Sequence, residues 1–150
     1  MTIAWLAIVN PTAGYSRSAH WRQMIVETIR REIGAEVVFT EYPGHATELA
    51  ATVKAERLVV FGGDGTIGEV VNGMALDRQR LLLLPGGTGN GLARDLGLHS
   101  MDTAFAAVIS NRLRSIDLIR VTFQSQGQTH SRLAISTASI GYAAEVVVLA

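Results

Sequence analysis

Ten of the fifteen glycines in this chain lie between Gly62 and Gly97, and two clusters of them directly follow short apolar runs. Residues 58–61 lead into Gly62-Gly-Asp-Gly-Thr66, and residues 81–84 lead into Pro85-Gly-Gly-Thr-Gly-Asn90. A wholly apolar run is typical of a strand that is buried on both faces of a parallel sheet. Because helical patterns separate the runs, the sequence predicts an α/β fold of three layers, with a parallel sheet between helices.

The expected strands lie at residues 3–9, 36–42, 58–61 and 81–84, and the expected helices at 18–33, 44–56, 67–76 and 101–109. Ser18 is suited to cap the first helix and Gly34 to end it. After residue 111 two partly alternating stretches, 113–124 and 130–140, flank a polar turn at 125–128, which predicts an antiparallel hairpin. We therefore expect an α/β domain at residues 1–111, which the motifs discussed below assign to nucleotide binding, and the opening strands of an incomplete β domain at 112–150.

The charge balance and residue content exclude several classes of protein. Thirteen basic residues oppose thirteen acidic ones, which argues against nucleic acid as a partner and against electrostatic capture by a membrane. The absence of cysteine excludes disulfide scaffolds, thiolate metal sites and cysteine nucleophiles. Neither a signal peptide nor an apolar stretch of about 18 residues is present, so we expect a cytoplasmic protein with at most peripheral membrane contact.

The polar and glycine-rich turns all follow predicted strands. Ligands of open parallel sheets bind beyond the carboxyl ends of the strands, so the turns at residues 10–14, 40–46, 62–66 and 85–90 are expected to line one crevice. A strand that passes through glycines into a helix offers backbone N–H groups and the positive end of the helix to a phosphate. The sequence therefore predicts a phosphate-binding site.

Asp64 is the candidate catalytic and metal-binding residue. A carboxylate among phosphate-binding amides is favourable when a divalent cation such as Mg²⁺ lies between them, as in a nucleoside triphosphate site. Alternatively, Asp64 caps a helix within a tight turn. Glu69, one turn later, either contacts ribose or a phosphate-bound metal, or supplies a favourable charge near the helix start. Of the four histidines, only His45 lies in a turn of the predicted site.

Several familiar nucleotide sites do not fit. Gly63-x-Gly65-x-x-Gly68 matches the dinucleotide fingerprint, but the next strand ends in Leu84-Pro85 and not in the acid that would hold the ribose. No P-loop is present, and the single lysine, Lys54, is expected in a helix away from both glycine turns.

These motifs together resemble the diacylglycerol kinase catalytic domain family, which includes bacterial lipid kinases and sphingosine and ceramide kinases. The resemblance rests on Gly62-Gly-Asp-Gly-Thr66, Glu69-Val-Val-Asn-Gly73 and Pro85-Gly-Gly-Thr-Gly-Asn90 with Leu92-Ala-Arg94. The opening turn Asn10-Pro-Thr-Ala-Gly14, Thr40 with Gly44-His-Ala46, Ile116-Asp-Leu118 and Ala138-Ser-Ile-Gly-Tyr142 match in the same order.

The resemblance implies that ATP and Mg²⁺ are bound here, with Asp64 as the catalytic and metal residue. The implied ATP-binding residues are Asn10, Pro11, Thr12, Ala13, Gly14, Thr40, Gly62, Gly63, Asp64, Gly65, Thr66, Glu69, Thr88, Gly89 and Asn90. Gly68, Gly91 and Ala143 stand where the family often has Asn, Asp and Asp, and the last departure weakens an inference of lipid head-group binding near Tyr142. The resemblance also implies a second, β-sandwich domain that carries the general base and further acids.

Three functions follow as hypotheses. The first is an ATP-dependent lipid kinase of phospholipid biosynthesis, which transfers the γ-phosphate to a lipid hydroxyl such as that of diacylglycerol. The second is a kinase of the NAD kinase type, and the third is a nucleotide-binding fragment without catalysis. Because the chain ends within an apolar run, we expect it to be part of a longer protein, weakly active alone and prone to self-association, for example as a homodimer.

Overall fold

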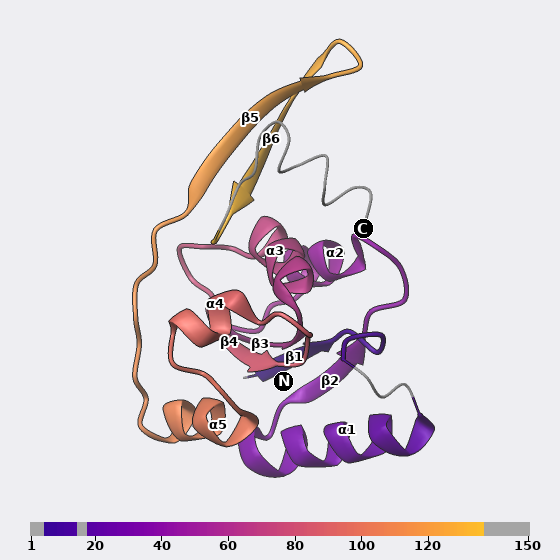
Figure 1. Ribbon diagram of the computed structural model, residues 1–150, viewed down its shortest axis with the longest axis vertical. Helices are drawn as coiled ribbons and strands as arrows, with labels where there is room; N and C mark the ends of the chain where they lie inside the picture. Colours follow the sequence, from indigo (N-terminus) through magenta and orange to yellow (C-terminus); the bar gives the residue numbers. More distant parts are fainter. Residues whose placement is uncertain (1–4, 15–17, 137–150) are drawn as a thin grey trace. The chain divides into compact units, whose positions relative to one another are not determined.

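Four parallel strands form the sheet of the first of two structural units, in the order β2-β1-β3-β4 (Figure 1). The computed structural model describes residues 5–14 and 18–136. The strands are β1 (Trp5–Val9), β2 (Glu36–Phe39), β3 (Arg57–Gly62) and β4 (Arg80–Pro85). The apolar residues in the middle of β1 and β3 are fully buried, since both faces of the sheet are covered. The predicted α/β fold with a parallel sheet is confirmed.

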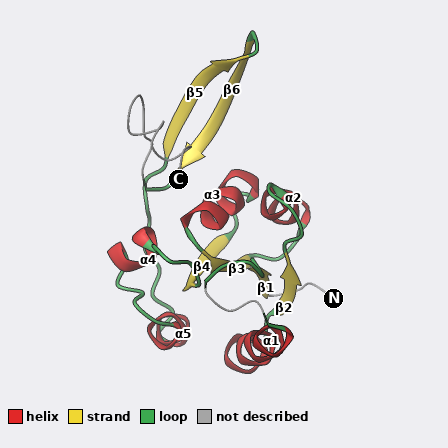
Figure 2. Ribbon diagram, turned by 45° about the vertical axis from the view of Figure 1, so that its right-hand side comes forward, coloured by secondary structure: helices red, strands yellow, loops and turns green. Residues whose placement is uncertain are grey.

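Helices cover the sheet on both faces and complete three layers (Figure 2). The helices are α1 (Ala19–Ile33), α2 (His45–Thr52), α3 (Asp64–Gly73), α4 (Gly91–Asp95) and α5 (Met101–Ile109). α2 and α3 lie side by side on one face, and α1 and α5 lie on the other (Figures 1 and 2). The core on the α1–α5 side includes Ile25, Ile29, Phe61 and Phe105.

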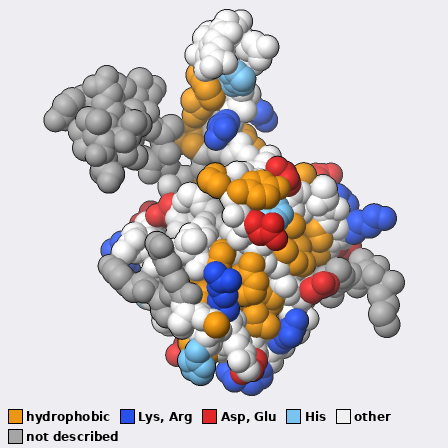
Figure 3. Space-filling model, turned by 90° about the vertical axis from the view of Figure 1, so that its right-hand side faces the viewer, with side chains coloured by type: hydrophobic (Ala, Val, Ile, Leu, Met, Phe, Trp, Pro, Cys, Tyr) orange, Lys and Arg blue, Asp and Glu red, His pale blue; other side chains and the backbone are white. Residues whose placement is uncertain are grey.

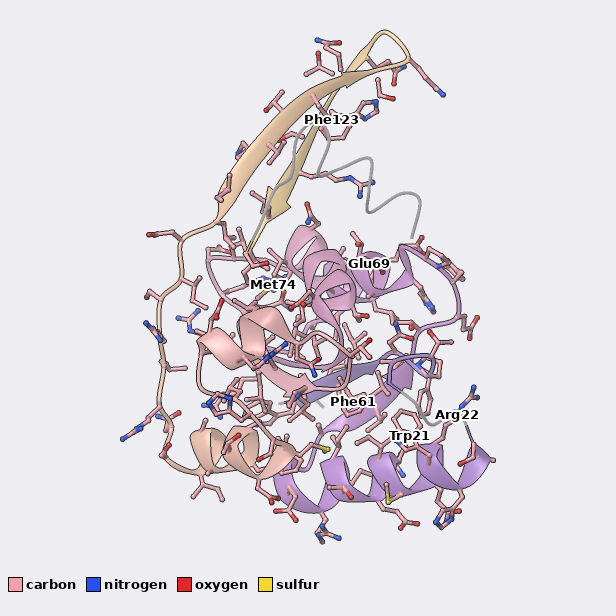
Figure 4. The ribbon with its side chains drawn as sticks, viewed as in Figure 1. Trp21, Arg22, Phe61, Glu69, Met74 and Phe123 are labelled. Carbon is pink, nitrogen blue, oxygen red and sulfur yellow. The ribbon has the colours of Figure 1, made fainter. Side chains whose placement is uncertain are left out.

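α1 shows how local sequence sets the ends of a helix. The hydroxyl of Ser18 accepts a hydrogen bond from the backbone N–H of Trp21 at 3.1 Å, as the capping prediction requires. Gly34 ends the helix in the left-handed conformation, with φ of 71°. The ring of Trp21 packs against that of Phe61, with centroids 5.4 Å apart (Figure 4).

α2 is shorter than predicted. The helix was expected to reach residue 56 but ends at Thr52, so Lys54 lies outside it. The buried Gln79 amide donates to the carbonyl of Ala55 at 2.8 Å and accepts from the N–H of Ala75 at 2.7 Å. The helix ends because Val53 takes an extended conformation, with φ of −76° and ψ of 141°, and the Gln79 amide satisfies the carbonyl of Ala55 beyond that end.

The other helix boundaries also differ from the prediction in places. α3 begins at Asp64, three residues before the expected start, and ends at Gly73. The five-residue helix α4 was not predicted, because it begins at a glycine and has no long apolar pattern. β2 ends at Phe39, which leaves residues 40–44 as a turn.

The second unit contains the predicted hairpin. The chain divides into units Met1–Ser115 and Ile116–Ala150. β5 (Ile119–Ser125) pairs antiparallel with β6 (Gln128–Ala134), so both strands are shorter than expected. Gln126 and Gly127 connect them with φ of 51° and 75°, the geometry of a tight two-residue hairpin turn. The motif at residues 138–142 and the apolar run at 145–150 lie outside the described residues.

The surface carries charges of both signs. On the face drawn in Figure 3, acidic and basic side chains are interspersed around apolar ones, in agreement with the balanced composition. Within the described ranges no helix combines the length and the apolar character that crossing a bilayer requires.

Candidate functional site

The glycine-rich turns and the turns after β1 and β2 begin side by side at one edge of the sheet. Backbone hydrogen bonds continue the ladder past the strand ends, from Asn10 N to Phe61 O and from Thr40 N to Val9 O, both at 2.9 Å. The N–H of Gly86 donates to Gly62 O at 3.2 Å in the same way. The structure therefore gathers the four turns, as expected for the carboxyl edge of a parallel sheet.

Asn10 ties the first turn to α3. Its Oδ1 accepts from the backbone N–H of Thr12 at 2.9 Å and from the Thr12 hydroxyl at 2.8 Å, which holds Pro11 within a tight turn. Its Nδ2 donates to the hydroxyl oxygen of Thr66 at 3.0 Å. Thr66 is only 8% exposed, so this contact anchors the turn to a fixed point at the start of α3.

Glycine is required where the turns approach one another. A Cβ on Gly14, which has φ of 74°, would lie 2.9 Å from the carbonyl oxygen of Gly86. A Cβ on Gly87 would lie 2.5 Å from the Cα of Gly63. These distances are too short for a side chain, so the turns after β1, β3 and β4 pack backbone against backbone, with Ala13 in the first of them.

The carboxylate of Asp64 crosses from one glycine turn to the other. Its Oδ2 accepts from the backbone N–H of Gly91 at 3.0 Å and its Oδ1 from that of Leu92 at 3.2 Å. Asp64 therefore caps α4, the helix that follows the second turn, and leaves its own helix without a side-chain cap. The N-cap of α3 is Gly63, which has no side chain to accept from the first turn.

The second glycine turn is braced by Asn90. Its Oδ1 accepts from Gly87 N at 2.8 Å, and its Nδ2 donates to Gly87 O at 2.6 Å. Asn90 has φ of 49°, and Arg94 donates from its guanidinium to the carbonyl of Gly89. Thr88 and Gly89 lie exposed at the tip of this turn. The conformation of the turn is thus set by its own side chains.

Glu69 connects α3 to the start of α2 (Figure 4). Its Oε2 accepts from the backbone N–H of Ala46 at 3.3 Å, and its carbonyl oxygen accepts from the hydroxyl of Thr47 at 2.9 Å. Asn72, one turn further on, donates to Gly68 O within α3 at 2.8 Å. Glu69 therefore holds the end of the turn that follows β2 through its contact with Ala46, which lies 23 positions earlier in the chain.

Tyr42 and His45 form a stacked pair in the turn after β2. Their ring centroids lie 4.5 Å apart, with an angle of 7° between the planes. His45 Nδ1 accepts from the backbone N–H of Glu41 at 3.1 Å. The Tyr42 hydroxyl donates to the Glu48 carboxylate at 2.8 Å, and this hydrogen bond raises the pKa of the phenol. His45 was expected from the sequence to lie at the site, but Tyr42 was not. The one sequence feature that could have indicated Tyr42 is an aromatic ring three residues before His45.

The donor set for a metal is small. Among residues 5–14 and 18–136, no group of three or more His, Asp or Glu side chains is placed to hold an ion. Asp64 is the acid within the glycine turns, and each of its oxygens accepts one N–H, which leaves further lone pairs. One carboxylate fits Mg²⁺ bound mainly through phosphate oxygens and water, rather than a cage of protein ligands.

Comparison with known proteins identifies a family. The family model described as the diacylglycerol kinase catalytic domain matches residues 4–121. The diacylglycerol kinase of Bacillus subtilis (strain 168) is 40% identical over 125 residues, which are 78% of this chain and 41% of that protein. Sphingoid long-chain bases kinase 1 of Arabidopsis thaliana is 32% identical over 146 residues, which are 87% of this chain and 19% of that protein. The chain thus spans less than half the length of either relative.

Solved structures share the fold. A crystal structure from Bacillus anthracis str. Sterne matches with a TM-score of 0.68 at 28% identity, over 85% of this chain and 44% of that chain. A diacylglycerol kinase structure from the same organism matches with a TM-score of 0.61 at 24% identity, over 89% of this chain and 61% of that chain. With most of its length matched by the family model, this chain belongs to the diacylglycerol kinase catalytic domain family, a family of lipid kinases.

Proposed function

We propose that this chain binds ATP with Mg²⁺ at the glycine turns and serves a lipid kinase that phosphorylates a hydroxyl of a diacylglycerol-like lipid. The observation that carries the proposal is the start of α3. The first backbone N–H groups, at Asp64, Gly65 and Thr66, have no partner within the helix, as at any helix start, and Gly63 has no side chain to accept from them. Such groups and the positive helix end favour a phosphate.

The surrounding turns supply the rest of the proposed nucleotide site. Residues 10–14 and 85–90 lie against the start of α3 through the Asn10–Thr66 hydrogen bond and the close approach of Gly63 to Gly87. Thr40 and Glu69 border the site at the turn after β2, beside the stacked rings of Tyr42 and His45. The site therefore offers backbone donors for phosphates and polar side chains around them.

Asp64 is the residue that we assign to Mg²⁺. Bound between carboxylate and phosphates, this ion would neutralise phosphate charge during transfer. Asp64 also holds the second glycine turn, so the same side chain positions the backbone of that turn and offers oxygens to the metal. In the proposed reaction the lipid oxygen bonds to the γ-phosphorus, the bond from that phosphorus to the β–γ bridging oxygen breaks, ADP leaves, and the proton of the hydroxyl passes to solvent water.

Charge placed in the first turn of α3 tests phosphate binding. A Cβ on Gly65 meets no atom within 4 Å, so Gly65→Asp is accommodated, and a carboxylate near the helix start stabilises the helix. We expect this variant to be folded at least as stably as the parent chain while binding ATP·Mg²⁺ at least about tenfold more weakly in calorimetry, because the carboxylate repels phosphate. Gly68→Asp, one turn later and equally open, is the matched control.

The proposal fails if the chain shows no saturable ATP binding or if Gly65→Asp and Gly68→Asp weaken it equally.

A second measurement addresses the reaction itself. Transfer of label from γ-labelled ATP to dioleoylglycerol in mixed micelles supports the lipid kinase assignment. Because the chain is expected to be only weakly active alone, even slow transfer above a no-enzyme control counts as support, and ATP binding with no transfer above that control would instead favour nucleotide binding without catalysis.

A further inference from the structure

A cavity lies at the edge of the sheet opposite to the glycine turns. Its volume is about 250 Å³, and it lies among the first residues of β1, β3 and β4 and the residues that follow α5. β3 has six residues, so roughly 16 Å separate this edge from the nucleotide edge. The cavity is therefore distinct from the site proposed above.

The register of the sheet brings three of the lining residues together. Trp5, Arg57 and Arg80 are the first residues of β1, β3 and β4, and Arg57 pairs with both of the others, so the three side chains lie on the same face. Trp5 packs against the core on the α1–α5 side, which identifies that face. The guanidinium carbon of Arg57 lies 5.1 Å from the centroid of a Trp5 ring, close enough for a cation–π contact.

Positive charge accumulates around this cavity in a chain that is neutral as a whole. Its lining includes four arginines, at positions 57, 78, 80 and 112, and one acid, Glu56, so four minus one leaves a net charge of +3. None of these arginines has a carboxylate oxygen within 4.0 Å among the described residues. The guanidinium of Arg80 donates to the backbone carbonyl of Gln79, at 3.3 Å. Like charges at paired positions of a sheet destabilise it, so the arrangement favours binding of an anion.

The inner wall of the cavity is apolar. Trp5, Leu82, Ala107 and Val108 line it and are each partly buried, whereas the four arginines are exposed at its rim. Guanidinium groups bind phosphate and carboxylate through paired hydrogen bonds, and an apolar wall accepts a short alkyl or aryl group. We propose that this cavity binds a small amphiphilic anion, with its phosphate or carboxylate at the arginines and its apolar part against Trp5 and Leu82.

Hexyl phosphate is the probe for this cavity. The chain has two tryptophans, so Trp21→Phe leaves Trp5, beside the arginines, as the only tryptophan, and excitation at the red edge of its absorption avoids the three tyrosines. We expect a saturable change in Trp5 emission with hexyl phosphate, and tighter binding than for inorganic phosphate or hexanol, because both parts of the ligand contribute. Arg80→Gln, which removes a charged hydrogen-bond donor, is expected to weaken binding by about tenfold. Arg30→Gln, at an exposed residue of α1, is the control.

Further arms separate the outcomes. Vesicles that contain phosphatidylglycerol test the source of the anion. If the chain binds these vesicles and Arg80→Gln weakens that binding, the anion is a membrane lipid. If the chain binds hexyl phosphate but not the vesicles, the anion is a soluble ester. Arg80→Gln should leave ATP binding unchanged, so failure here and failure of the proposed nucleotide site are distinguishable. The proposal is overturned if hexyl phosphate gives no saturable change or if Arg80→Gln and Arg30→Gln behave alike.

Discussion

The Oδ1 atom of Asp64, the first residue of α3, accepts a hydrogen bond from the backbone N–H of Leu92 at 3.2 Å, 28 positions later in the chain. Leu92 is buried within α4, so this bond fixes the second glycine turn relative to the first. The residue that we assign to the metal is therefore also the N-terminal cap of a neighbouring helix. Loss of Asp64 is expected to affect both stability and nucleotide binding.

Replacement of Asp64 by alanine is predicted to lower the free energy of unfolding by about 1 kcal/mol, the usual effect of removing a helix cap. The N–H groups of Gly91 and Leu92 lose their acceptor, so their amide hydrogen exchange should become faster. Asp77→Asn, at an exposed acid outside the glycine turns, serves as the control in urea unfolding. Unchanged exchange at Gly91 and Leu92 would contradict the capping role.

Two glycines of α3 are predicted to respond in opposite directions to alanine. A Cβ on Gly73 would lie 2.0 Å from the carbonyl oxygen of Thr47 in α2, so Gly73→Ala must separate the two helices. We expect a loss of more than about 2 kcal/mol in the free energy of unfolding. A Cβ on Gly68 meets nothing within 4 Å, and Gly68→Ala should raise stability by up to about 1 kcal/mol. Urea unfolding of both variants checks this, and equal effects would refute the close packing of α2 on α3.

The contact between Asn10 and Thr66 is predicted to be energetically coupled. Asn10→Ala and Thr66→Val each remove one partner of the 3.0 Å hydrogen bond between the first turn and α3. We expect the double variant to be less destabilised than the sum of the single ones, with a coupling free energy of about 1 kcal/mol. Additive effects in thermal or urea unfolding would show that the two side chains act independently.

Tyr42 is predicted to ionise above the range of an ordinary tyrosine. Its hydrogen bond to the Glu48 carboxylate raises the pKa of the phenol, and the negative charges of Glu48 and Glu41 act in the same direction. A raised pKa in the folded chain means that this contribution to stability is present below the unfolded pKa, about 10, and is lost as the pH rises through the raised value. Absorbance at the phenolate band, with Tyr42→Phe to assign the transition, measures it.

Glu48→Gln supplies the comparison for that titration. The amide removes the charge that holds the phenolic proton, so the pKa of Tyr42 should fall toward its ordinary value. A titration curve that is the same in Glu48→Gln as in the parent chain would show that the hydrogen bond does not govern Tyr42.

Much of the fold is readable from local sequence. The apolar runs of β1, β3 and β4 indicate strands buried on both faces, and Ser18 and Gly34 mark the ends of α1. The glycines of both turns were expected at the carboxyl edge of the sheet, and the structure places them there. These predictions depend on backbone conformation and hydrophobic period, which are properties of short segments.

Contacts between distant segments decided the rest. The capping of α4 by Asp64 and the hold of Glu69 on Ala46 join residues 23 to 28 positions apart, and no local pattern indicates such partners. The bond from Gln79 to the carbonyl of Ala55, beyond the end of α2, joins residues that are similarly far apart in the chain. Sequence therefore determined which segments are the strands and longer helices and where the glycine turns lie, because each follows from its own residues. Only the tertiary structure decided which side chains hold those turns together, and the row of Trp5, Arg57 and Arg80 exists only because parallel pairing sets three strands in register.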